Sequence, residues 1–230
     1  MGELKLVAVT AGLSKPSSTR LLTDRLVAAV TGHLGAGAPA GVRVVELRDL
    51  AVDIANHLVS GWPSKALGEA LDAVSGADAL IAVTPVFAGS YSGLFKSFFD
   101  LLDPDALTGT PVLLAATGGT PRHSLVVEHA LRPLFSYLHA LTLPTAVFAA
   151  TDDWGAAADT HADGLPARID RAGREFAALL TPSGAGVPRA RPAPAPGRAA
   201  ETEQHAETEH GAEAEPDLEV VPFERLLSGD

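Results

Sequence analysis

The residues best suited to bind an anion lie in the stretch "GLSKPSSTR", from Gly12 to Arg20. It places four hydroxyl side chains beside two cations, namely Ser14, Ser17, Ser18 and Thr19 with Lys15 and Arg20. An apolar run precedes the stretch and a segment with helical spacing, "LLTDRLVAAV", follows it, so the hydroxyls stand where a helix begins. The first backbone N–H groups of a helix lack internal partners and carry partial positive charge. The stretch therefore predicts a phosphate site; the simpler alternative is that Ser17 or Ser18 only caps the helix.

The kind of phosphate is narrowed by two motifs that this stretch lacks. It has neither the G-x-G-x-x-G of dinucleotide-binding loops nor the G-x-x-x-x-G-K-[ST] of nucleoside triphosphate loops. A cradle of hydroxyls without those glycines suits a terminal phosphomonoester, such as that of FMN.

A second candidate stretch, "TPVFAGSYSGLFKSFFD", runs from Thr84 to Asp100. Its small residues and exposed backbone ahead of a helix predict a surface for a planar ring, with these residues as candidate contacts: Pro85, Val86, Phe87, Ser90, Tyr91, Ser92 and Gly93. The alternative is that "SYSG" is a simple helix cap. For the phenylalanines and leucines of 94–102, packing in the core or an interface is the favoured interpretation.

The third candidate stretch is "ATGGTPRHS", residues 116–124. Two adjacent glycines permit a positive φ and close approach of the backbone to a ligand. Their N–H groups are suited to bind the polar edge of a ring and to stabilise negative charge on it. The candidate residues are Thr117, Gly118, Gly119, Thr120 and His123. A plain tight turn before a helix is the alternative.

These three stretches are spaced by the elements of an α/β fold. Apolar, β-branched runs predict strands at 4–10, 42–47, 79–85, 111–116 and 145–150, and amphipathic segments predict helices at about 18–33, 63–75, 92–102, 122–139 and 167–180. Nearly continuous apolar strands must be covered on both faces. The pattern predicts a doubly wound, five-stranded parallel sheet in the flavodoxin-like order 2-1-3-4-5, whose ligand site lies at the carboxyl ends of the strands.

Composition divides the chain into three parts. Residues 1–180 form the predicted domain and carry a net charge of −5 out of the total of −11. Residues 181–217 are rich in Pro, Ala and Glu and predict a disordered linker, and 218–230 form a short apolar segment suited to docking.

Composition also excludes several functions. The chain has no basic stripe, which argues against nucleic acid as a partner. It has no cysteine, so disulfides, thiolate metal sites and cysteine nucleophiles are excluded, and the histidines lack the spacing of a metal site. Without a long apolar run or a leader, we expect a cytoplasmic protein that does not enter the membrane.

Taken together, the three stretches resemble the NADPH-dependent FMN reductase family of flavodoxin-like flavoenzymes. The resemblance covers roughly residues 4–155. It is strongest to the two-component reductases that supply reduced flavin to luciferase-like and alkanesulfonate-type monooxygenases. It implies that the hydroxyls of the first stretch hold the FMN phosphate, that 85–93 lies along the isoalloxazine and that 117–120 meets its edge.

The resemblance further implies an activity and an assembly. The expected reaction is hydride transfer from NADPH or NADH to FMN with no protein acid or base, in a homodimer or homotetramer. Alkanesulfonate-type relatives carry an inserted tyrosine in a π-bulge at a subunit interface, and the aligned residue here is His129. Two alternatives stay open: a reductase of quinones, azo compounds or metal oxyanions with prosthetic FMN, and a flavodoxin-like electron carrier without nicotinamide activity.

Overall fold

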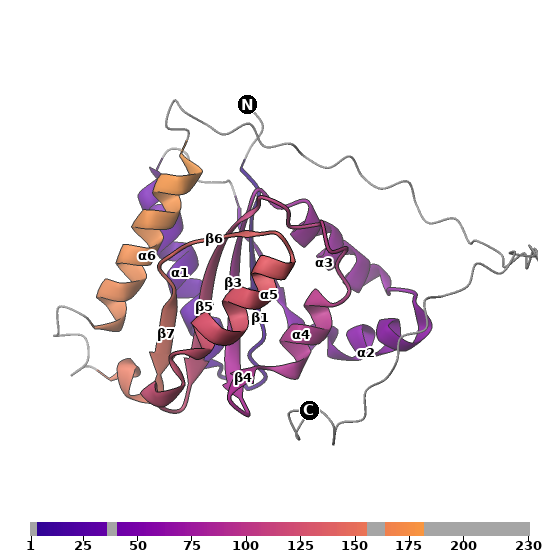
Figure 1. The fold of residues 1–230 in the computed structure, drawn as a ribbon, viewed down its shortest axis with the longest axis horizontal. Coiled ribbons are helices and arrows are strands. Elements are labelled where there is room, and N and C mark those ends of the chain that lie inside the picture. Colours follow the sequence, from indigo (N-terminus) through magenta and orange to yellow (C-terminus); the bar gives the residue numbers. More distant parts are fainter. Residues whose placement is uncertain (1–3, 36–40, 156–163, 182–230) are drawn as a thin grey trace, which may run out of the picture. The chain divides into compact units, whose positions relative to one another are not determined.

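The sheet of this protein is parallel and carries helices on both faces (Figure 1). The computed structural model describes residues 4–35, 41–155 and 164–181. The parallel strands are β1 (Leu6–Thr10), β2 (Arg43–Glu46), β3 (Ala79–Phe87), β5 (Pro111–Gly118), β6 (Leu141–Thr142) and β7 (Val147–Ala150). They follow the order β2-β1-β3-β5-β6, with β7 also paired to β5 and the short β4 (Ser90–Tyr91) antiparallel to β3. The predicted flavodoxin-like fold is confirmed.

The sheet differs from the prediction by an additional short strand, because β6 precedes β7, which corresponds to the strand predicted at 145–150. β6 pairs with the start of β5 through Pro111 and Val112, whereas β7 pairs with its end from Ala115 to Gly118. Pro144 lies between the two strands and has no N–H to give to a ladder, so a single continuous strand is excluded there.

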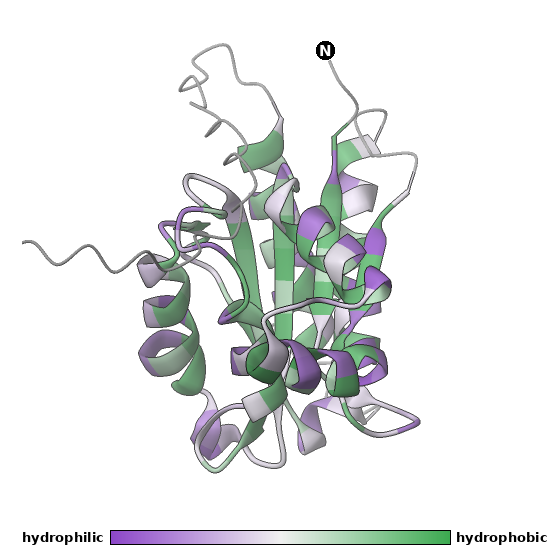
Figure 2. Ribbon diagram, turned by 90° about the vertical axis from the view of Figure 1, so that its right-hand side faces the viewer, coloured by the Kyte–Doolittle hydropathy of each residue, from purple (hydrophilic) through white to green (hydrophobic). Residues whose placement is uncertain are grey.

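The alternation of side chains along each strand builds two separate apolar layers. On β1, Val7 and Val9 belong to the layer under α2 (Ala51–Ser60), α3 (Lys65–Ser75), α4 (Gly93–Phe99) and α5 (Arg132–Tyr137). Leu6 and Ala8 point to the opposite layer, under α1 (Ser18–Leu34) and α6 (Leu165–Leu180). As two covered faces require, the central strands in Figure 2 are hydrophobic along their length, and the helices turn polar faces outward.

The segment after β2 is helical, which the sequence interpretation left unassigned. A 3₁₀-helix at Leu47–Leu50 runs into α2. Only Ile54 of α2 is buried. Residues 182–230, for which a linker and the apolar segment 218–230 were predicted, lie outside the described residues.

The predicted helix 122–139 is a 3₁₀-helix at Pro121–His123, a π-helix at Val127–Leu131 and then α5. The N–H of Arg132 donates to the carbonyl of Val127, five residues back. Pro133 gives the physical reason, because its ring would meet the carbonyl of His129 in a regular α-helix. A widened turn avoids that contact. His129 lies within the π-helix with an exposed side chain.

α1 and α6 pack so closely that one position admits only glycine. A Cβ atom added to Gly173 would lie 2.7 Å from the Cβ of Ala29 and 3.0 Å from its backbone carbon. We therefore expect Gly173→Ala to lower the free energy of unfolding by about 1–3 kcal/mol, the usual cost of overpacking. Urea unfolding measures it.

The matched control for this substitution is Gly68→Ala in α3. Only one side-chain atom, of Pro63, lies within 4 Å of the added Cβ, at 3.9 Å. Alanine is the better helix former, so this variant should gain about 0.5–1 kcal/mol. Equal stabilities of the two variants would show that α1 and α6 are not in such close contact.

Candidate functional site

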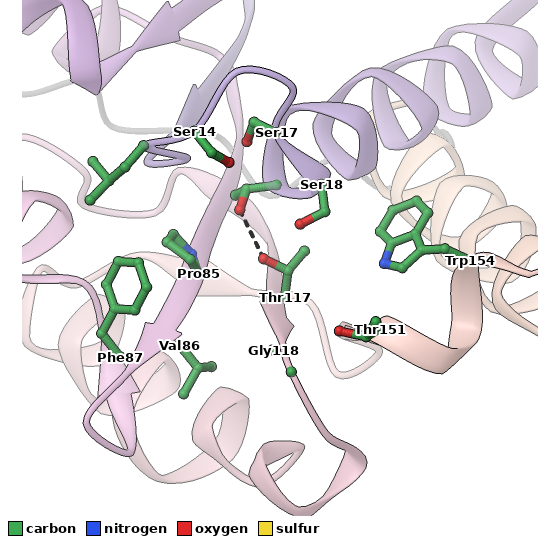
Figure 3. A pocket seen from close by; sticks show the side chains of 13 residues that line it. Ser14, Ser17, Ser18, Pro85, Val86, Phe87, Thr117, Gly118, Thr151 and Trp154 are labelled. Atoms are coloured by element: carbon green, nitrogen blue, oxygen red, sulfur yellow. Dashed lines mark hydrogen bonds between the residues drawn. The ribbon is translucent and has the colours of Figure 1, made fainter.

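A pocket of about 510 Å³ opens at the carboxyl ends of β1, β3 and β5 (Figure 3). This volume falls in the range of small-molecule sites. All three predicted stretches contribute to it, and the lining residues are Leu13, Ser14, Ser17, Ser18, Thr19, Pro85, Val86, Phe87, Thr117, Gly118, Gly119, Thr151 and Trp154. The structure thus brings together ten of the seventeen residues named from the sequence, and the other seven lie outside this lining.

The first stretch both caps α1 and lines the pocket. The Ser17 hydroxyl accepts a hydrogen bond from the N–H of Arg20 at 3.1 Å, which is an N-cap. Ser14 and Ser18 also line the pocket, and neither hydroxyl is the cap. Gly12 makes this fold possible, because a Cβ there would lie 2.0 Å from the Ser17 oxygen. The capping alternative is therefore correct for Ser17 alone, and it is compatible with an anion site.

Thr19 and Thr117 join the first stretch to the third at the base of the pocket. Their hydroxyl oxygens are 2.8 Å apart in a buried hydrogen bond, drawn in Figure 3. The exposed fractions of the two residues are 2% and 4%. A buried pair of this kind fixes the spacing of β1–α1 against β5, so the pocket is preformed at this point.

Arg20 does not line the pocket. Its guanidinium forms ion pairs with Asp24, at 2.8 Å, and with Glu46. The hydrogen bond that Arg20 donates to Asp24, together with the charges of Asp24 and Glu46, raises the pKa of Arg20 above its ordinary value. Arg20 as a phosphate ligand thus stays a prediction that this geometry does not support.

A different arginine, which the sequence interpretation did not single out, holds the first stretch. Arg48 donates to the carbonyl of Ser14 at 2.9 Å, and its other nitrogen lies 3.4 Å from Glu46. The sequence signal is "ELRDL", a cation between two acids directly after the strand that pairs with β1. Arg48 is a positioning residue for the backbone of the stretch.

In the second stretch only Pro85, Val86 and Phe87 reach the pocket. The Thr84 hydroxyl donates to the carbonyl of Pro85 at 3.0 Å and accepts from the N–H of Ser92 at 3.1 Å. This arrangement ties the strand end to the turn that follows it.

The remaining predicted residues of the second stretch, Ser90 to Gly93, lie outside the pocket lining. Tyr91 packs on Phe95, and the Ser92 hydroxyl caps α4 by accepting from the N–H of Phe95 at 3.2 Å. The "SYSG" segment thus contains the helix cap that the alternative expected, at Ser92, and its contact with a ring stays a prediction. Phe98 and Phe99 are fully buried in the core of the same chain, which explains the apolar helix without a partner subunit.

In the third stretch the glycines line the pocket, but not for the reason expected. Neither Gly118 nor Gly119 adopts a positive φ. A Cβ on Gly118 would lie 2.8 Å from Cζ of Phe148, whereas nothing lies within 4 Å of a Cβ on Gly119. Gly118 is therefore required by packing, and Gly119 leaves space open at the pocket.

Thr120 and His123 lie beyond the pocket lining. The Thr120 hydroxyl caps the 3₁₀-helix by accepting from the N–H of Arg122 at 3.1 Å, and the His123 side chain is exposed. Conversely, Thr151 and Trp154 line the pocket although the sequence interpretation missed them. The signal that was available is their place directly after β7, at the same edge of the sheet as the other three stretches.

The described residues include no helix with the length and apolar character that a membrane span needs. No group of three His, Cys, Asp or Glu side chains in the same part of the chain is arranged to hold a metal ion.

The fold is that of a flavodoxin-like α/β protein with a pocket at the carboxyl ends of its parallel strands. The sequence model described as "NADPH-dependent FMN reductase" matches residues 4–155, and the chain belongs to this family.

Three similar proteins illustrate the membership. An "FMN reductase (NADPH)" of Pseudomonas aeruginosa is 47% identical over 150 residues, which are 65% of this chain and 78% of that protein. The "NADH-dependent FMN reductase SfnF" of Pseudomonas fluorescens is 44% identical over 77% of this chain and 92% of its own length. A solved oxidoreductase from Corynebacterium diphtheriae is 45% identical, with a TM-score of 0.72 over 78% of this chain and 98% of that one.

Proposed function

We propose that this protein binds FMN in the described pocket, catalyses its reduction by NADPH or NADH, and supplies the reduced flavin to a flavin-dependent monooxygenase. The observation that carries the proposal is the pocket itself. The N-terminus of α1 and the hydroxyl groups of Ser14 and Ser18 line one part of it, and the segments 85–87 and 117–119 line other parts. The names of the relatives support both nicotinamide nucleotides as donors.

The residues of the pocket have separate roles in this proposal. Ser14, Ser18 and the first N–H groups of α1 bind the phosphate, where the helix dipole favours negative charge. Pro85 to Phe87 form an apolar wall for the ring. The N–H groups of Gly118 and Gly119 lie at its polar edge, where they stabilise negative charge.

No ionisable side chain is among the described residues that line the pocket. This composition agrees with a reaction that needs no protein acid or base. Hydride transfer is chemistry that the nicotinamide and flavin supply when both are bound. The protein's contribution is to align the two rings and to exclude water from between them.

The assay that tests the proposal is NADPH and NADH oxidation with added FMN, FAD or riboflavin, beside a visible spectrum of the purified protein. We expect a colourless protein that oxidises the nucleotide when FMN is added, with sequential kinetics. A yellow protein with ping-pong kinetics would identify FMN as a prosthetic group instead. Absence of oxidation with every flavin would contradict the proposed reaction.

A substitution of Arg48 tests the part of the pocket where the phosphate is proposed to bind. Arg48→Met removes the hydrogen bond to the Ser14 carbonyl while keeping much of the apolar stem. We expect the dissociation constant for FMN to rise about tenfold, because hydrogen bonds from charged groups contribute on the order of 1.5–3 kcal/mol. Fluorescence titration of FMN measures it. An unchanged constant would show that the first stretch keeps its shape without Arg48.

The homodimer or homotetramer and the cytoplasmic location are proposals that rest on the sequence interpretation. The buried phenylalanines of α4 no longer argue for an interface, so the assembly rests on the family resemblance. Light scattering coupled to size-exclusion chromatography measures the assembly directly, and a monomer at micromolar concentration would contradict it.

A further inference from the structure

The loop after β7 forms a fourth wall of the pocket. Thr151 and Trp154 line the same cavity as Ser18. Figure 3 shows Trp154 beside Ser18, on the opposite side of the pocket from Phe87, with the nitrogen edge of the indole toward Thr117. Trp154 is therefore placed at the end of the pocket where the first stretch lies, away from the apolar wall.

This wall is held in place by the protein's own hydrogen bonds. The Asp153 carboxylate accepts from the N–H of Ala150 at 2.7 Å and pairs with Arg168 at 2.7 Å. Arg168 also donates to the carbonyl of Phe148 at 2.6 Å. Asp153 thus ties the loop to the end of β7 and to α6, and Arg168 joins those two elements, which preorganises the neighbouring tryptophan.

Further contacts hold the indole ring of Trp154 in place. Its ring packs against the apolar layer under α1 and α6, and the Arg25 guanidinium carbon lies 5.2 Å from the ring centroid. A cation at that distance is attracted by the ring face. Among the described residues, the indole N–H has no hydrogen-bond acceptor, although such groups usually find one when they are partly buried.

A phosphate group in this pocket would need uncharged hydrogen-bond donors such as the indole N–H. A phosphomonoester carries close to two negative charges, yet the lining includes no lysine or arginine, and Arg20 and Arg48 are both paired with Glu46. Lys15 is exposed and lies outside the lining, so the lining itself offers only neutral donors for recognition. The hydroxyls of Ser14 and Ser18 and the amides of α1 supply part of it, from one side of the pocket.

We infer that Trp154 is a further binding residue, whose indole N–H donates to the phosphate group of the bound flavin from the side opposite Ser14. This inference rests on the proposed function, since it names a recognition element of the same pocket. Its consequence is selectivity: Trp154 favours FMN over riboflavin, which has the same ring and ribityl chain but no phosphate.

The test compares the affinities of FMN and riboflavin for two variants of the full chain. Trp154→Phe removes the N–H and keeps an aromatic ring. We expect its dissociation constant for FMN to rise about tenfold, the effect of one hydrogen bond to a charged group, with no change for riboflavin. The chain has two tryptophans, so Trp62→Phe, at a position that is 80% exposed, is the matched control and should change neither constant.

Each other outcome has a defined meaning. Equal weakening of both flavins by Trp154→Phe would indicate a packing role and would overturn the inference. Unchanged affinity for FMN would also overturn it while leaving the proposed function standing. If the wild-type chain bound neither flavin, the proposed function itself would fail and the inference with it.

Discussion

The substitution Ser18→Glu is expected to weaken FMN binding by two to three orders of magnitude without any loss of stability. Ser18 is the first residue of α1 and lines the pocket. A carboxylate there stands where the phosphate is proposed to bind. Two unit charges about 4 Å apart repel by about 4 kcal/mol at an effective dielectric constant of about 20.

The same substitution has the opposite effect on the fold. A negative charge in the first turn of a helix is stabilising by about 0.3–1 kcal/mol, and α1 has no acidic residue in its first turn. Binding and stability should therefore change in opposite directions, which separates a loss of the site from a loss of the fold. Isothermal titration with FMN and urea unfolding measure the two.

Two controls sharpen this prediction. In Ser18→Gln the glutamine side chain has nearly the same size as glutamate but no charge. This variant should therefore bind FMN much more tightly than Ser18→Glu. Riboflavin has no phosphate, and its affinity should be nearly the same for both variants. If Ser18→Glu bound FMN as wild type does, the phosphate could not lie at the N-terminus of α1.

The second large effect is expected at the third stretch, where Gly119→Val should lower FMN affinity by about 10- to 100-fold. Gly119 lines the pocket, and nothing lies within 4 Å of a Cβ built there. The valine side chain would occupy space that the ring needs, while no protein atom is displaced. Steric misfit of a methyl or two in a pocket costs on the order of 1–3 kcal/mol. Equilibrium dialysis measures the affinity and thermal unfolding should show an unchanged Tm.

Gly118→Val is the neighbouring control, and it should behave differently. Its Cβ would lie 2.8 Å from the Phe148 ring, so the variant should lose about 1–3 kcal/mol of stability. The two adjacent glycines thus separate a defect in binding from one in packing. Normal FMN binding by Gly119→Val would show that the third stretch does not approach the flavin.

The positions of the pocket-forming stretches could be predicted because they depend only on the order of the elements. Continuous apolar strands must be covered on both faces, and alternation with helices makes the sheet parallel. Once the order is 2-1-3-4-5, the loops after β1, β3 and β5 meet at one edge. The hydroxyls near Ser18 and the glycines near Gly119 lie at that edge for this reason.

The roles of individual side chains were harder to predict, because they depend on neighbours that are distant in sequence. Arg20 is drawn away by Asp24 on its own helix and by Glu46 from β2, a partner that sequence spacing does not reveal. Gly118 is required by the ring of Phe148 on another strand rather than by its own φ. Trp154 follows β7, whose end at Ala150 agrees with the predicted strand, but the loop after this strand was not among the three stretches expected at the site.

The π-helix at Val127–Leu131 could not be predicted from the spacing of apolar residues. The apolar pattern over 122–139 fits one continuous helix. Pro133 removes an N–H donor and crowds the turn before it, and the spacing of apolar residues carries no information about this effect. A proline inside a helical pattern is the local clue that was available. The widened turn places His129 on the surface, where the resemblance puts a subunit contact.

The most direct test is to measure FMN and riboflavin binding to the wild-type chain side by side, by equilibrium dialysis with and without NADPH. If serines and helix amides hold a phosphate beside β1, FMN is retained at micromolar concentration and riboflavin is bound at least about tenfold more weakly. Equal retention of both flavins, or of neither, would contradict that arrangement.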